Sequence, residues 1–176
     1  PGGGALRITG GGTLAVTGTD FVGNRVRGRG GAVFLGSGLE AVFTGCVWRE
    51  NAAVGGSDGR GGAVMIDAGA APTDAVFRDC TWQDNTSGGP GGAMMALSSE
   101  VLVEDATVTG NRSGLESGFC EAPGLHFRRY ADHHDQPVAV TVRGSLFVGN
   151  EMVPDATYTG GDGGAIYAAG GGGARM

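Results

Sequence analysis

A short module that ends in asparagine recurs along the chain, and this recurrence constrains the fold more than any other feature. Each copy is a β-patterned run that ends in an aromatic residue or valine, followed by two residues and the asparagine. The closing asparagines are Asn24, Asn51, Asn85, Asn111 and Asn150. They are 27, 34, 26 and 39 residues apart, a period typical of the coils of a solenoid, with the extra length confined to particular loops.

A second module alternates with the first and explains why the chain has 38 glycines in 176 residues. It is a glycine pair followed by alanine and an apolar residue, with a weaker copy at 123–125. The clear copies begin at Gly3, Gly30, Gly61, Gly91 and Gly163. Glycine pairs permit a positive φ at a corner and let neighbouring coils approach closely. Glycine and β-branched residues at this density also exclude a helical solenoid.

Aligning the copies on their asparagines places similar residues in columns. The column three residues before the asparagine is Phe21, Trp48, Trp82, Val108 and Phe147. Two inward columns precede it, and polar residues alternate with them, as a strand with one dry face requires. Stacked asparagines can donate to and accept from their counterparts, which satisfies buried amide groups.

Parallel stacking accounts for these columns, because only then does each residue lie about 4.8 Å from its counterpart in the next coil. The sequence therefore predicts an all-β fold, a single-stranded right-handed parallel β-helix of the pectate-lyase type with five to six coils. We expect residues 1–176 to form one β-helix segment of a longer chain, with a loop insertion at about 112–137.

The charge of the chain excludes one class of partner. The formal net charge is −6 and the isoelectric point is near 4.9, whereas binding to a phosphate backbone needs clustered cations. We therefore expect no nucleic-acid partner. No apolar stretch approaches the roughly 20 residues that span a bilayer, and nothing in the sequence indicates a cofactor.

An outer column contains the strongest enzyme-like features. Arg78, Glu104 and Arg143 fall on successive coils and predict a ladder of ion pairs. Asp79 and Asp105 occupy matching positions that could bring two carboxylates together for acid–base chemistry. The equivalent residues in the other coils are glycines, so we expect a turn at this column, because aspartate and glycine both favour turns.

The insertion at 112–137 contains all three histidines of the chain. Asp132, His133, His134 and Asp135 could ligate a metal, but adjacent histidines in a strand point to opposite faces. We expect a solvated loop without a metal, and we expect these residues together with His126 to be the part of the chain most suited to contact a partner.

Two cysteines, Cys46 and Cys80, fall in one inward column on neighbouring coils. A disulfide between them is geometrically allowed. Because the column otherwise holds small residues, we expect two buried thiols.

The alternation of Gly-Gly-Ala-apolar with Phe-x-x-Asn resembles the repeat of the chlamydial polymorphic outer membrane proteins. Phe21 to Asn24 and Phe147 to Asn150 match the second motif directly. The resemblance implies an extracellular or cell-surface β-helix of the kind associated with adhesion.

We therefore expect a non-enzymatic structural or adhesin-like segment that presents an elongated binding surface to a protein or glycan, beside further coils or domains of its own chain. The alternatives are a polysaccharide lyase or hydrolase, and a fibre-forming structural protein that assembles with itself.

Overall fold

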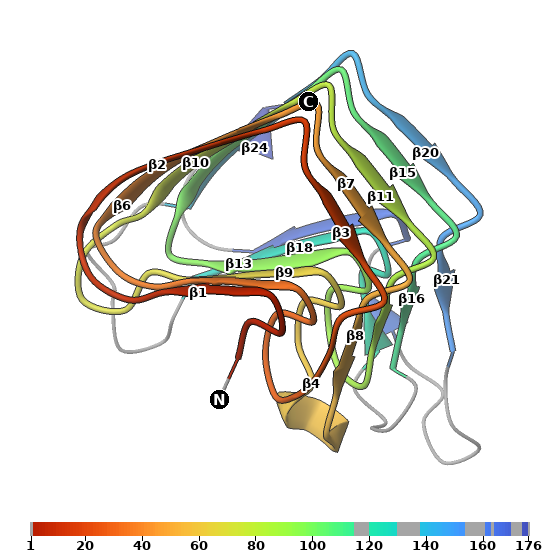
Figure 1. The fold of residues 1–176 in the computed structure, drawn as a ribbon. Coiled ribbons are helices and arrows are strands. Elements are labelled where there is room, and N and C mark those ends of the chain that lie inside the picture. The colour runs from red at the N-terminus through yellow and green to blue at the C-terminus, as the bar shows by residue number, and fades with distance from the viewer. Residues whose placement is uncertain are drawn as a thin grey trace.

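The computed structural model describes residues 2–114, 120–129, 138–153, 161–162, 164–169 and 174–175, and it confirms the predicted parallel β-helix. Every strand pair is parallel, and the chain passes through about five coils of four strands each. The coils wind right-handedly away from the N-terminus (Figure 1). Among the described residues the helical content is one 3₁₀ turn, η1 (Gly56–Asp58), and no described helix is long and apolar enough to cross a membrane.

Four parallel sheets run the length of the helix, and each is named here by its first strand. The β1 sheet contains β1 (Leu6–Ile8), β5 (Val33–Leu35), β9 (Val64–Asp67), β13 (Met94–Leu97), β18 (Leu125–Arg128) and β23 (Ile166–Ala169). The β2 sheet contains β2 (Gly12–Thr17), β6 (Leu39–Thr44), β10 (Asp74–Arg78), β14 (Glu100–Glu104), β19 (Ala139–Arg143) and β24 (Ala174–Arg175).

The other two sheets have five strands. The β3 sheet contains β3 (Asp20–Val22), β7 (Val47–Arg49), β11 (Thr81–Gln83), β15 (Thr107–Thr109) and β20 (Leu146–Val148). The β4 sheet contains β4 (Arg25–Arg27), β8 (Ala52–Val54), β12 (Thr86–Ser87), β16 (Arg112–Ser113) and β21 (Glu151–Met152). A further pair joins β17 (Cys120–Glu121) to β22 (Gly161–Asp162).

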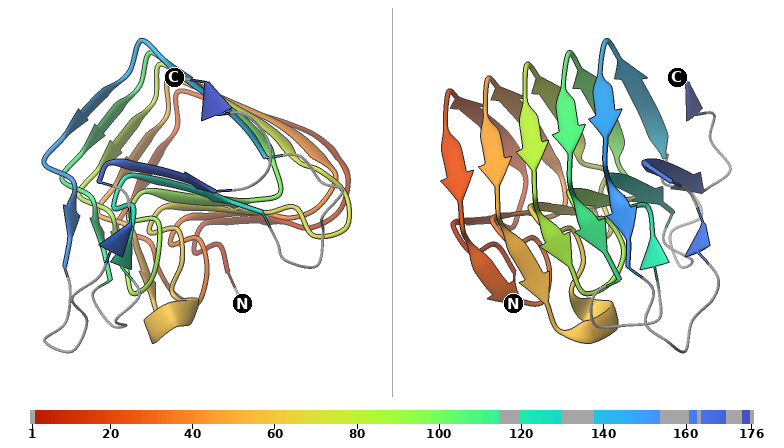
Figure 2. Two further views of the ribbon diagram at one scale, coloured as in Figure 1. Left: turned by 180° about the vertical axis from the view of Figure 1, so that it is seen from behind. Right: turned by 90° about the vertical axis from the view of Figure 1, so that its right-hand side faces the viewer.

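The cross-section is a triangle with an arm. The β1, β2 and β3 sheets enclose the main core, and the β4 sheet continues past the corner and projects from the body (Figures 1 and 2). At the corner between β2 and β3, and at the corner between β3 and β4, each coil turns on one residue with positive φ. The first corner uses Gly18, Gly45, Asp79, Asp105 and Gly144, and the second uses Gly23, Glu50, Asp84, Gly110 and Gly149.

The main core is built from stacked columns. Trp48 lies between Phe21 and Trp82, with ring centroids 5.5 and 4.9 Å apart and the rings nearly parallel. The neighbouring column stacks Phe43 on Phe77 at 5.1 Å, and these rings meet the tryptophans edge-on. The indole nitrogens of both tryptophans are buried without a hydrogen-bond partner, so ring packing outweighs a lost hydrogen bond at each position.

The five asparagines form a continuous hydrogen-bonded ladder at the second corner. The Oδ1 atom of Asn85 accepts from both the backbone N–H and the Nδ2 of Asn51, at 3.0 and 2.9 Å. Its own Nδ2 donates to Asn111 and to the carbonyl oxygen of Trp48. The pattern repeats from Asn24 to Asn150. Each amide therefore links its coil to the coils on both sides.

We expect Asn85→Ala to lower the free energy of unfolding by about 2–5 kcal/mol, because it leaves the buried Asn51 donors without their acceptor. Asn24→Ala is the matched control: Asn24 is half-buried and is linked to a neighbour on one side only in the described ladder, so its loss should be less than half as large. Urea unfolding followed by far-UV circular dichroism measures both. Equal losses would contradict a cooperative ladder.

The second glycine of each pair is required by close approach between coils. A Cβ atom added to Gly62 would collide with the carbonyl oxygen of Gly92 and with the Thr86 backbone, and one added to Gly31 would collide with the Gly62 carbonyl. Both obstacles are backbone, so neither can move aside cheaply. The first glycine of each pair adopts a positive φ, for example 63° at Gly61.

We expect Gly62→Ala to cost about 3 kcal/mol or more of stability. Gly45→Ala should cost about 1–2 kcal/mol, since Gly45 has a positive φ but open space around its Cα. Thermal and urea unfolding of the two variants make the comparison. A Gly62→Ala loss no larger than the Gly45→Ala loss would show that φ, and not coil contact, requires the glycine pairs.

The predicted insertion at 112–137 needs correction within the described residues. Strands β16, β17 and β18 lie inside it, and β18 pairs with β13 in the β1 sheet. The segment 123–125 acts as a full glycine module, because Gly124 packs against the Ala165 carbonyl as the other pairs pack against their neighbours. Proline in place of the first glycine hid this equivalence in the sequence.

Candidate binding surfaces

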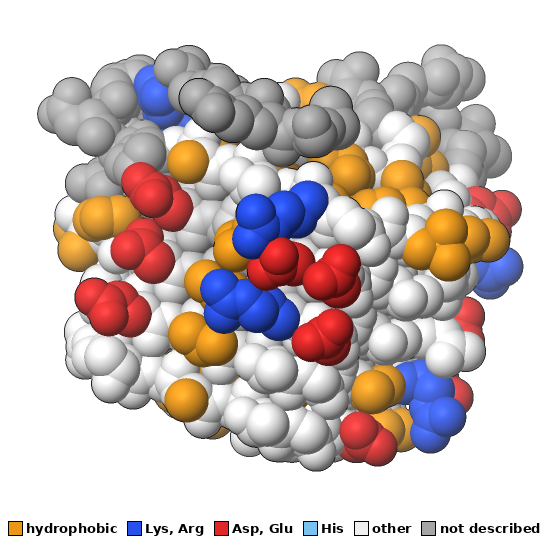
Figure 3. All heavy atoms as spheres, turned by 90° about the horizontal axis from the view of Figure 1, so that it is seen from above, with side chains coloured by type: hydrophobic (Ala, Val, Ile, Leu, Met, Phe, Trp, Pro, Cys, Tyr) orange, Lys and Arg blue, Asp and Glu red, His pale blue; other side chains and the backbone are white. Residues whose placement is uncertain are grey.

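Three rows of side chains run along the helix axis on the outer face of the β2 sheet (Figure 3). They follow from register: each residue of β10 lies beside its counterpart in β6 and in β14. The carboxylate row is Glu40, Asp74 and Glu100; the aliphatic row is Val42, Val76 and Leu102; the ion-pair row is Arg78, Glu104 and Arg143. These nine residues are called the β2 face below.

The ion-pair row forms as its spacing predicts. Arg78 Nε lies 3.1 Å from Glu104 Oε2, and an Arg143 guanidinium nitrogen lies 2.7 Å from Glu104 Oε1. Glu104 is therefore neutralised from both sides. The arginine side chains are 45% and 61% exposed, so each pair contributes only about 0–1 kcal/mol.

The carboxylate row differs, because its members have no ion-pair partner within the described part of the chain. All three side chains are exposed. Beside them the half-buried Val76 and Leu102 line a shallow groove of about 240 Å³, which Asp74 and Glu100 border. The β2 face thus places unneutralised negative charge next to aliphatic surface.

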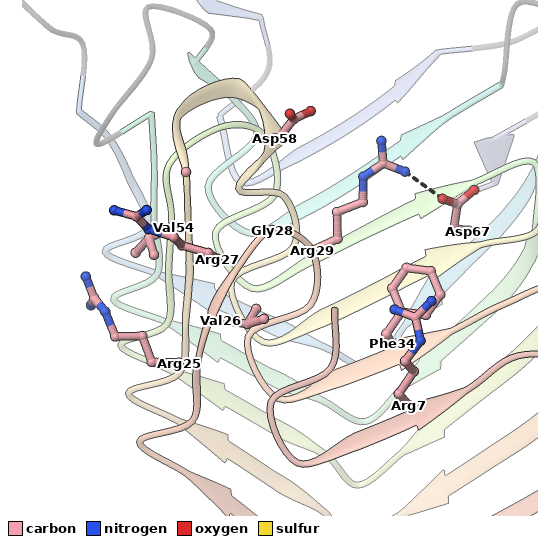
Figure 4. Close-up of a pocket in the computed structure, with 11 residues that line it drawn as sticks. Arg7, Arg25, Val26, Arg27, Gly28, Arg29, Phe34, Val54, Asp58 and Asp67 are labelled. Atoms are coloured by element: carbon pink, nitrogen blue, oxygen red, sulfur yellow. Dashed lines mark hydrogen bonds and ion pairs between the residues drawn. The ribbon is translucent and has the colours of Figure 1, made fainter. Parts of the chain in front are cut away.

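A larger cleft of about 1060 Å³ lies between the arm and the outer face of the β1 sheet (Figure 4). Arg7, Phe34 and Asp67 come from the β1 sheet, and Val26 and Val54 come from the arm. An Arg29 guanidinium nitrogen lies 2.7 Å from Asp67 Oδ2, and this ion pair ties the chain after β4 to strand β9.

The cleft holds one further cation and does not resemble an acid–base site. The Arg7 guanidinium lies 4.7 Å from the Phe34 ring centroid, a cation–π contact. The Arg25 and Arg27 side chains also border the cleft, but they point away from it on the far face of β4 (Figure 4). Because Asp67 is committed to Arg29, the arrangement is better suited to hold a polar ligand than to transfer protons.

Sequence reasoning missed this cleft and the second apolar row beneath the arm. On the outer face of the β1 sheet the row is Arg7, Phe34, Met65, Met95, His126 and Tyr167. Phe34, Met65, Met95 and Leu97 form a separate buried cluster. Gly30 lies against Met65 and Gly91 against Met95, so chain returning from the arm covers the row. Runs such as Val-Met-Ile and Met-Met-Ala-Leu, apolar on both faces, were the available signal.

His126 is placed differently from the prediction. It was expected to contact partners from a solvated loop, but it lies in β18 with no exposed surface. Its ring stacks on Tyr167 with centroids 4.8 Å apart, and neither ring nitrogen has a hydrogen-bond partner. Register is the cause: 125–128 continues the β1 sheet, and position 126 falls in the covered row.

Burial controls the protonation of His126. Desolvation, with smaller contributions from the positive charges of Arg128 and Arg60, lowers its pKa from 6.5 to about 3. The Glu121 carboxylate lies 3.6 Å from Nε2, beyond hydrogen-bonding distance, and does not offset the cost of burying an imidazolium. The ring is therefore neutral in the folded chain at neutral pH.

We expect acid to destabilise the chain through His126. A folded pKa below the unfolded pKa means that its stabilising contribution is complete above pH 6.5 and is lost as the pH falls toward 3. Between pH 6.5 and 4.5 the loss should be about 2.5 kcal/mol. His126→Met, which copies Met95 in the same row, should remove most of this slope in urea unfolding. An unchanged slope would place the acid sensitivity elsewhere.

The remaining candidates are in structural surroundings. Asp79 and Asp105 are exposed corner residues with φ of 52° and 51°, which explains why glycine alternates with aspartate there. Cys46 and Cys80 are buried free thiols, and burial raises the pKa of Cys80 to about 11. A thiol with this pKa is a poor nucleophile at neutral pH.

Part of the predicted contact loop cannot be placed. Asp132, His133, His134 and Asp135 lie outside the described residues. Within the described ranges no group of three or more histidine, cysteine, aspartate or glutamate side chains is arranged to hold a metal ion.

Comparisons with protein-family models, with curated proteins and with solved structures find no match to this chain. The fold is therefore a parallel β-solenoid without an assigned family.

Proposed function

We propose that this chain is a non-enzymatic, surface-exposed or extracellular segment that is structural or adhesin-like and presents an elongated binding surface to a protein or glycan. The observation that supports this best is the β2 face, where three chemically distinct rows run side by side along the axis (Figure 3). Such a surface displays the same contact on successive coils, which suits a partner that binds by repetition.

Rigidity is the second support. The asparagine ladder and the stacked rings hold neighbouring coils in register, so the rows of the β2 face are preorganised. A preorganised surface loses little conformational entropy on binding. The coils therefore serve as a spacer and as a contact surface at once.

The motif resemblance adds to the proposal. The alternation of glycine pairs with the asparagine-ended module is similar to the chlamydial polymorphic outer membrane protein repeat, and membership of such a group would imply extracellular or cell-surface localisation. Further coils or domains of the same chain would then continue the surface. The alternative of a polysaccharide-cleaving enzyme depends on Asp79, Asp105 and Glu104, which the corner and the ion-pair row already account for structurally.

Beads coated with the chain should attach to cultured cells or to immobilised surface proteins and glycans, and Val76→Arg with Leu102→Arg should weaken attachment about tenfold or more. Thr81→Arg with Thr107→Arg is the matched control, since it adds the same charge on the same two coils of the β3 sheet. Attachment counts at several bead densities provide the measurement.

Two results would contradict the proposal. One is attachment that the β2-face and control variants weaken equally. The other is cleavage of a polysaccharide, detected as new reducing ends, that Asp79→Ala, Asp105→Ala and Glu104→Ala abolish without loss of folding.

A further inference from the structure

The carboxylate and aliphatic rows of the β2 face complement a particular kind of side chain. Lysine and arginine carry a cationic head on an aliphatic stem and bury the stem along apolar surface. Val76 and Leu102 would receive the stems, and Asp74 and Glu100 would receive the heads. Because the carboxylate row has no internal cation, unlike the ion-pair row, a bound basic group would relieve repulsion between carboxylates in register.

The spacing of the rows selects the backbone of the partner. The three carboxylates lie on neighbouring strands, about 4.8 Å apart along the axis. An α-helix lying parallel to the axis offers one side chain per turn at intervals of about 5.4 Å, so three contacts accumulate a mismatch of only about 1.2 Å. An extended strand offers same-face residues about 6.7 Å apart, and its mismatch over three contacts is about 4 Å.

The aliphatic character of the groove favours a polypeptide over a sugar. Its floor contains valine and leucine and no aromatic ring among its lining residues, whereas a helix laid in a groove is held by aliphatic anchors at positions one turn apart. Within the described part of this chain there is no α-helix, so the helix belongs to another protein.

We propose that the β2 face binds a basic amphipathic helix of a partner protein, laid along the solenoid axis with its cations on Glu40, Asp74 and Glu100 and its aliphatic residues on Val76 and Leu102. This rests on the proposed function, because it names the partner of the same surface. The contact is electrostatic and apolar together, so it weakens with salt but is not abolished by it.

The test uses a fluorescein-labelled peptide of about four helical turns, with arginine at every fourth position and leucine on the adjoining stripe. Fluorescence anisotropy should show binding to the 176-residue chain at least tenfold tighter than binding of a scrambled peptide of the same composition. A proline placed mid-peptide should also weaken binding at least tenfold, because it breaks the helix.

Two matched variants locate the site. Glu40→Gln with Asp74→Asn and Glu100→Gln should weaken the helical peptide at least tenfold. Asp20→Asn with Asp79→Asn and Asp105→Asn removes the same charge from exposed positions off the β2 face and should change binding less than threefold. Circular dichroism verifies that both variants fold.

Equal affinity for the designed and scrambled peptides, or equal loss in the two triple variants, would overturn the helix proposal. So would binding of a glycan, and not of the peptide, through the same carboxylates. If the peptide fails to bind while the Val76→Arg and Leu102→Arg beads still lose attachment, the helix proposal falls and the proposed function stands. If attachment is also independent of the β2 face, both fall.

Discussion

The register between coils is the constraint on which the rest of this structure depends. Each residue lies beside its counterpart, so every coil must offer the same shape and hydrogen-bonding capacity at the same place. The asparagine ladder enforces this most strictly, because each Oδ1 atom accepts two donors from a neighbouring coil. The glycine pairs enforce it sterically, since a Cβ at Gly31 or Gly62 would meet the backbone of the next coil. A shift by one residue would break both.

Register also determines the outer surface. Because strands stack without offset, single exposed positions become rows along the axis, and chemistry on one coil is repeated on the next. The contrast between Glu104, paired on both sides, and Asp74, which has no described ion-pair partner, is a contrast between whole rows. An extended partner would meet rows, which is why the proposed function concerns an elongated surface and not a single pocket.

The arm introduces chemistry that a simple three-sided solenoid would lack. It covers the outer face of the β1 sheet, so Met65, Met95 and His126 are buried on a side where a solenoid normally meets water. Near the first coils the cover is thinner and leaves the cleft beside Arg7 and Phe34. The two features have one origin, since the same row is closed over at His126 and open at Arg7.

The sequence by itself determined the coils, the asparagine ladder, the aromatic column and the ion-pair row, because those depend on matching residues at a fixed spacing. Only the tertiary structure decided what the arm covers: the burial of His126, the second apolar cluster and the cleft between Arg29, Asp67 and the β1 sheet. The reason is physical. Stacking between equivalent residues leaves a periodic trace in the chain, whereas the folding of one sheet back over another brings together residues with no common spacing.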